Sequence, residues 1–188
     1  MTSPRRSRAF VSGLMSIAVF GACLVGTTGT ALADDEFDPE ARLQGLGIEL
    51  PTPSAPVANY VRTVRTGDLV FTSGHGPKGP DGEYVTGKVG ANLTLAEGYA
   101  AARSTAVALL TSLKAEIGDL SRVRRIVKVL GMVNSDPGFT DQHKVINGCS
   151  DLLVEVFGER GRHARSAVGM ASLPMGIAVE IEMIVEID

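Results

Sequence analysis

Residues 177–187 alternate between apolar and polar side chains, and this run constrains the fold more than any other part of the sequence. Successive side chains of a strand point to opposite faces, so the pattern predicts a strand with one buried face and one outward face. The buried face would carry Ile177, Val179, Ile181, Met183, Val185 and Ile187, and the outward face Ala178, Glu180, Glu182 and Glu186, with Ile184 as the exception.

A second strand-like run, residues 163–172, precedes it, and a Leu-Pro-x-Gly turn at 173–176 joins the two. We predict that the runs fold back on each other as a hairpin. Arg165 on the first run and Glu180 on the second would then reach one small ligand. A guanidinium can hold a carboxylate in fork geometry, and a nearby carboxylate can move protons or position water. The pairing predicts a site for a small carboxylated molecule.

Local signals place the elements before this pair. Short β-prone runs at 60–65 and 69–73 flank a Thr-Gly-Asp turn and predict a hairpin. Thr94 and Glu97 form a capping-box pattern, and apolar residues then recur at helical spacing until Gly118.

Residues 123–133 are apolar on both faces, which predicts a central strand. Asp136-Pro137 predicts a helix entry, and a second helix should follow within 139–157, closed by Gly158. The order β-β-α-β-α-β-β predicts an α+β fold, a mixed sheet with both helices packed on one face. The apolar residues of the other face need cover, and a partner subunit is the economical answer.

The N-terminus is typical of an export signal. Three arginines precede an uncharged stretch, residues 9–33, which ends in Ala31-Leu32-Ala33. We predict a signal peptide over 1–33, cleavage before Asp34, and an exported protein. An uncleaved membrane anchor is the alternative, because 25 uncharged residues could span a bilayer. Residues 34–49 are then expected to be an acidic tether, and residues 50–188 the folded domain.

Cleavage removes three arginines and no acidic residue, which leaves 15 basic and 21 acidic residues and a net charge near −6. That balance argues against binding nucleic acid, which needs clustered Lys and Arg.

Cys149 would have no partner in the mature chain, so no disulfide is expected. The three histidines lie in separate elements, so we expect no metal. The Gly-x-Gly-x-x-Gly string at 74–79 leads into Pro80, not a helix, so no dinucleotide or other cofactor is expected.

Three stretches, 59–61, 67–74 and 164–182, have an order and spacing that resemble the RidA/YjgF/YER057c/UK114 family, also called endoribonuclease L-PSP. The resemblance runs from about residue 50 to 188. It implies a chorismate-mutase-like fold, a homotrimer with ligand clefts between subunits, and deamination of reactive enamines or imines to 2-oxo acids and ammonia. The Gly-Arg-His-Ala-Arg-Ser-Ala variant at 161–167 indicates a divergent branch.

The resemblance also implies site residues. Arg165 would hold the substrate carboxylate and Glu180 the hydrolytic water, and Tyr60 would line the pocket. Ser73 and His75, in and directly after the Thr-Ser-Gly motif, complete the predicted substrate-binding set, although His75 could equally be a loop histidine with no role.

Besides His75, which stands where a glutamine is common in the family, two departures leave catalysis open. Ala167 stands where the better-known deaminases have a cysteine, and Gly169 replaces a larger polar residue. The alternative is therefore a non-catalytic binding module for small carboxylated metabolites. A ribonuclease, as the older family name suggests, fits the acidic chain least.

Overall fold

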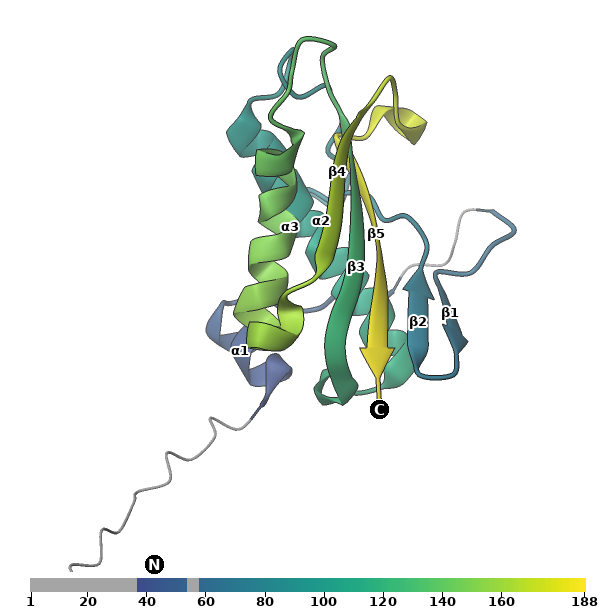
Figure 1. Ribbon diagram of the computed structural model, residues 1–188. Coiled ribbons are helices and arrows are strands. Elements are labelled where there is room, and N and C mark those ends of the chain that lie inside the picture. The colour runs from purple at the N-terminus through teal and green to yellow at the C-terminus, as the bar shows by residue number, and fades with distance from the viewer. Residues whose placement is uncertain (1–36, 54–57) are drawn as a thin grey trace, which may run out of the picture. The chain divides into compact units, whose positions relative to one another are not determined.

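The computed structural model describes residues 37–53 and 58–188, and the predicted export signal lies outside them. In the described part, three helices accompany one five-stranded sheet (Figure 1). The helices are α1 (Pro39–Gly45), α2 (Leu95–Ile117) and α3 (Gln142–Phe157), with short 3-10 turns η1 (Leu120–Arg122), η2 (Gly158–Gly161) and η3 (Pro174–Gly176). The strands are β1 (Thr63–Thr66), β2 (Leu69–Thr72), β3 (Val123–Asn134), β4 (Ala164–Met170) and β5 (Val179–Ile187).

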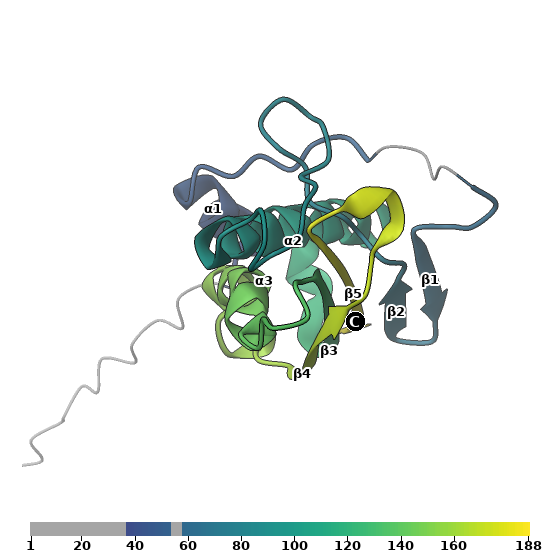
Figure 2. The same ribbon diagram turned by 90° about the horizontal axis from the view of Figure 1, so that it is seen from above.

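The strand order is β1-β2-β5-β3-β4, and only the β3–β4 pair is parallel. Seen from above, α2 and α3 lie together on one side of the sheet (Figure 2). The predicted class is therefore confirmed as α+β, a mixed sheet with two helices on one face. Among the described residues, no helix is both long enough and apolar enough to cross a membrane.

Helix α2 begins and ends where the sequence predicts. The Thr94 hydroxyl accepts from the Glu97 backbone N–H at 3.2 Å, and the Glu97 carboxylate accepts from the Thr94 backbone N–H at 2.7 Å. Two backbone donors of the first turn are thereby satisfied. At the other end Gly118 has φ 84°, which suits a glycine in the position that ends a helix.

Helix α3 begins later than Asp136-Pro137 predicts. The Asp136 side chain accepts from the Gly138 backbone N–H at 2.9 Å, which makes a turn, and the helix starts at Gln142. Inside α3, a Cβ on Gly148 would collide with the backbone carbonyl of Tyr99 on α2. The interior glycine therefore allows the two helices to approach closely.

The predicted closing hairpin is wrong. Strands β4 and β5 both pair with β3, which lies between them, β4 in parallel and β5 antiparallel. The connection through η3 crosses the end of β3, where the Asn134 backbone N–H donates to the Ala178 carbonyl at 2.9 Å. A turn signal fixes a reversal of direction, but it does not exclude a strand from entering between the two runs.

Part of the expected tether is packed structure. Within residues 34–49, Asp38 caps helix α1 by accepting from the Ala41 backbone N–H at 2.9 Å, and Leu43 is buried. Ile48 also packs against the core. These apolar contacts, with that of Phe37 and the Glu40–Lys114 ion pair, attach the segment to the domain.

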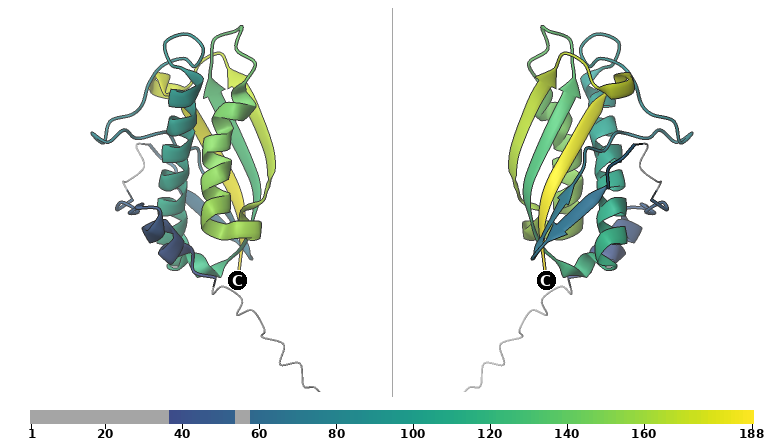
Figure 3. Two further views of the ribbon diagram at one scale, coloured as in Figure 1. Left: turned by 90° about the vertical axis from the view of Figure 1, so that its left-hand side faces the viewer. Right: turned by 90° about the vertical axis from the view of Figure 1, so that its right-hand side faces the viewer.

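The sheet face opposite the helices, called the open face below, retains exposed apolar side chains. Figure 3, right, shows the strands in front of the helices on this side. The register places Val64 opposite Phe71, and Phe71 opposite Ile184. The exposed fractions are 54% for Val64, 38% for Phe71, 41% for Val168 and 36% for Met170. A face this apolar is typical of an interaction surface.

Candidate functional site

Glu180 lies near the start of β5 on the open face. Its neighbours Val179 and Ile181 are fully buried on the helix side, so alternation turns Glu180 to the other side. The carboxylate is packed over Gly74, where a Cβ would collide with it. Burial, and to a smaller extent the charge of Glu182, raises the pKa of the Glu180 carboxyl above its usual value. A carboxyl of this kind is suited to accept and return protons.

In the segment after β2, Gly74 lies on the open face beside Glu180, whereas the His75 side chain lies on the helix side. His75 pairs with Ile181 through two backbone hydrogen bonds of 2.9 and 3.0 Å, but its side chain is buried on the helix side. There Nδ1 donates to the Ser73 carbonyl at 2.8 Å, and Nε2 accepts from the Ser112 hydroxyl at 2.7 Å. Burial lowers the pKa of His75. His75 is therefore a neutral core histidine in this chain, turned away from Glu180.

Ser73 and Tyr60 are less constrained. Among the side chains that the structure describes, the Ser73 hydroxyl is the one buried polar group without a hydrogen-bond partner. Such an oxygen is available to a bound ligand or water. Tyr60 lies in the segment before β1 and is 44% exposed.

Arg165 is held by α3. Its Nη1 donates to the Asn147 Oδ1 and to the Ser150 Oγ, each at 2.9 Å, and Nη2 donates to the His143 carbonyl at 3.3 Å. All three acceptors are neutral, and no ion pair of Arg165 occurs within residues 37–53 and 58–188. The guanidinium is thus a fixed, uncompensated positive charge, which favours an anionic ligand.

Arg165 and Glu180 lie on opposite faces of the sheet. Arg165 is in register with Val129 of β3, and Glu180 with Met132. Positions 129 and 132 are an odd number of residues apart, so their side chains point to opposite sides. One chain therefore does not bring the two groups to a single ligand, contrary to the hairpin prediction.

The two departures from the family pattern have packing roles. Ala167 packs against the core on the helix side. A Cβ on Gly169 would lie 2.7 Å from the Gln142 Nε2 and 2.8 Å from the Ser135 Oγ, so a larger residue would displace both. Gly169 thus allows the start of α3 to approach β4.

Sequence reasoning missed the residues around Arg165. Asn147 and Ser150 are three positions apart on α3, and His163 precedes β4. The i, i+3 spacing of two polar side chains on a helix packed at a sheet edge was the available signal.

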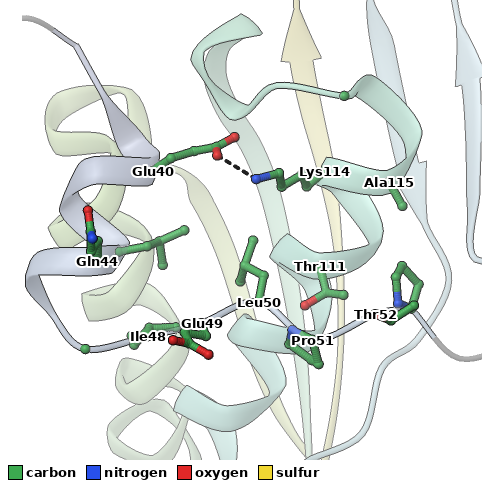
Figure 4. Close-up of a pocket in the computed structure, with 14 residues that line it drawn as sticks. Glu40, Gln44, Ile48, Glu49, Leu50, Pro51, Thr52, Thr111, Lys114 and Ala115 are labelled. Atoms are coloured by element: carbon green, nitrogen blue, oxygen red, sulfur yellow. Dashed lines mark hydrogen bonds and ion pairs between the residues drawn. The ribbon is translucent and has the colours of Figure 1, made fainter.

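Two hollows in the described part of the chain bear on the search for a site. One has a volume of about 280 Å³ and lies at the edge between β4 and α3. The other, of about 820 Å³, lies between α1, the following segment and α2. Figure 4 shows the second with its Glu40–Lys114 ion pair, and none of the predicted site residues lines it. No group of three or more His, Cys, Asp or Glu side chains in residues 37–53 and 58–188 is placed to hold a metal.

This chain is similar to one family of known proteins. Residues 40–187 match the family described as YjgF/chorismate mutase-like. Protein TCP17 of Trypanosoma cruzi is 51% identical over 149 residues, which cover 79% of this chain and 93% of that protein.

Solved structures also match. Protein Atu1372 of Agrobacterium tumefaciens, solved as a protein of unknown function, is 48% identical with a TM-score of 0.73, over 80% of this chain and 92% of that chain. The YjgF gene product of E. coli is 25% identical with a TM-score of 0.51, over 73% of this chain and 94% of that one.

Proposed function

The chain belongs to the YjgF/chorismate mutase-like family, and we propose that it hydrolyses small carboxylated enamines or imines to 2-oxo acids and ammonia. The observation that carries the proposal is Glu180, a half-buried carboxyl with a raised pKa, packed over Gly74 on the open face. Hydrolysis of a C=N bond needs one group that takes a proton from water and later returns it to nitrogen. A carboxyl with a raised pKa suits both tasks.

The substrate carboxylate needs a cation, and Arg165 is suited to hold it. Its Nη1 bonds orient the guanidinium, while no bond of Nε to a described residue is present. Because Arg165 and Glu180 lie on opposite faces, the proposal requires two subunits. Arg165 on the edge strand β4 of one subunit would complete the site that contains Glu180 of its neighbour.

A homotrimer supplies such clefts between subunits. The apolar residues of the open face support assembly, since Val64, Phe71, Val168 and Met170 remain exposed in one chain. A ring of three identical contacts is closed and gives three equivalent sites.

The chemistry then follows in two steps. Glu180 takes a proton from water as the water oxygen bonds to the carbon of the protonated imine, and the C=N electron pair passes to nitrogen. Glu180 next gives this proton to the amine nitrogen, the C–N bond breaks as the hydroxyl proton returns to Glu180, and ammonia and the 2-oxo acid leave. Arg165 holds the carboxylate throughout, and the Ser73 hydroxyl is available to the ligand or the water.

The test is ammonia release from 2-aminoacrylate generated in situ. Glu180→Gln removes the base and keeps the shape, so turnover should fall by about 10²- to 10⁴-fold. Glu186→Gln is the matched control, because Glu186 shares the open face but is paired with Arg125 at 2.7 Å. Its turnover should equal that of the wild type.

Calorimetry with 2-oxobutanoate tests Arg165. Arg165→Lys keeps the charge and loses the fork, so affinity should fall by about ten- to a hundredfold. Unchanged affinity would show that Arg165 is only structural. Wild-type protein that binds 2-oxobutanoate but releases no ammonia would establish the alternative, a non-catalytic binding module.

A further inference from the structure

The Ser150 hydroxyl lies between a histidine and an arginine at the β4–α3 edge. Its Oγ is 3.0 Å from the His163 Nε2 and accepts from the Arg165 Nη1 at 2.9 Å. In the proposed imine chemistry this hydroxyl only helps to orient Arg165, and the histidine has no role.

The hydrogen bonds fix the tautomer of His163. Its Nδ1 lies 2.7 Å from the Gly161 carbonyl oxygen, which can only accept, so Nδ1 carries the proton. The Nε2 atom is then an acceptor, and the Ser150 hydroxyl donates a hydrogen bond to it. A nucleophile bonded to a base that a third group orients is the arrangement of nucleophilic catalysis.

Arg165 acts on both partners. Its positive charge stabilises a negative charge developing on the Ser150 oxygen. Burial, and to a smaller extent the charge of Arg165, lowers the pKa of His163, which keeps the imidazole neutral and able to accept a proton.

A second serine–histidine pair in this chain has the same hydrogen bonds but cannot be reached by a ligand. The Ser112 hydroxyl bonds His75 Nε2 at 2.7 Å, and His75 Nδ1 bonds a carbonyl at 2.8 Å. That set is sealed, because Ser112 is 5% exposed and His75 3%. The Ser150 set instead lines the hollow of about 280 Å³, together with Asp151, Val154 and Arg162.

We propose that Ser150 is a nucleophile toward small activated acyl and phosphoryl compounds, with His163 as its general base. The Ser150 oxygen bonds to the carbonyl carbon of an ester while its proton passes to the His163 Nε2. The ester C–O bond then breaks, and the leaving alkoxide takes that proton. Water attacks the acyl-serine through the same base, which releases the acid and returns the proton to Ser150.

Diisopropyl fluorophosphate tests the nucleophile directly, because the phosphoryl–serine bond is stable and fluoride is the leaving group. Intact mass and peptide mapping of the folded protein should show one adduct, at Ser150. His163→Gln should slow labelling by about 100-fold or more, as loss of a general base does. Ser104→Ala is the control, since Ser104 bonds only the backbone of Lys78, and its labelling rate should equal that of the wild type.

Labelling should also vanish when the wild-type protein is unfolded in denaturant, which keeps the test valid if His163→Gln folds poorly. No adduct on the folded protein, an adduct at Ser112 or elsewhere, or equal rates in wild type and folded His163→Gln would each overturn the proposal. Equal rates would mean that the Ser150–His163 bond only fastens β4 to α3.

Discussion

At the scale of single residues, ionisation of the Glu180 carboxyl lowers the free energy of unfolding. Its pKa is raised above the value of an unfolded glutamate, so the folded state binds its proton more tightly. Stability is therefore lost as pH rises from the ordinary glutamate pKa through the raised one. The same burial that would suit Glu180 to the proposed role of base makes its charged form destabilising.

Glu180→Gln should accordingly increase the free energy of unfolding at pH 7, and the gain should shrink as pH falls from the raised pKa to the ordinary glutamate pKa. Urea unfolding at several pH values measures it. Glu83→Gln, at an exposed position, should change little at any pH. A loss of stability at pH 7 in Glu180→Gln would contradict the conclusion that the charged Glu180 carboxylate destabilises the fold.

Gly74 should be needed for the position of this carboxylate. A Cβ at residue 74 would meet the end of the flexible Glu180 side chain, which can move aside without unfolding the protein. Gly74→Ala is expected to keep the wild-type melting temperature and circular dichroism while lowering kcat for ammonia release. Wild-type kcat in a folded Gly74→Ala variant would show that the packing of Glu180 over Gly74 is not important for turnover.

At the scale of elements, the sequence predicts those whose signals are local. The capping box of α2, the β1–β2 turn and the apolar run of β3 each lie within a few residues, and all three elements are found. The β4–β5 hairpin fails because both runs pair with β3, whose residues lie 36 to 64 positions earlier in the chain. The face of Glu180 could be read from alternation, whereas the face of Arg165 depends on the register with Val129.

Helix α3 should tolerate no side chain at Gly148. A Cβ there meets the backbone carbonyl of Tyr99, which cannot move without separating α2 from α3. Gly148→Ala should therefore lower the free energy of unfolding by about 1–3 kcal/mol or more, measured by denaturant titration. Gly45→Ala is the control, since nothing lies within 4 Å of a Cβ there, and it should be neutral or slightly stabilising. Equal effects of the two changes would refute the close approach of the helices.

At the scale of the whole molecule, we expect the open face to decide how subunits assemble. Phe71 lies on β2, next to the edge strand β1, and is 38% exposed and in register with Val64 and Ile184. We expect a homotrimer by light scattering at micromolar concentration, and Phe71→Glu should shift it to monomers because a charge would be buried in the interface. Leu46→Glu, 42% exposed just after α1, should remain trimeric. A monomeric wild type would remove the basis for a shared site.

The most direct test of the shared site mixes two variants in one assembly, each impaired at one of the two groups and assayed at a substrate concentration well below KM. The Glu180→Gln chain still has an intact Arg165, and the Arg165→Lys chain still has an intact Glu180. Each subunit contact that brings these two intact residues together restores one site. Random trimers from equal amounts of both chains should recover about one quarter of wild-type ammonia release, because one contact in four has the required order. Mixed trimers, verified by native mass spectrometry, that release ammonia no faster than the average of their two parents would contradict a site built from two subunits.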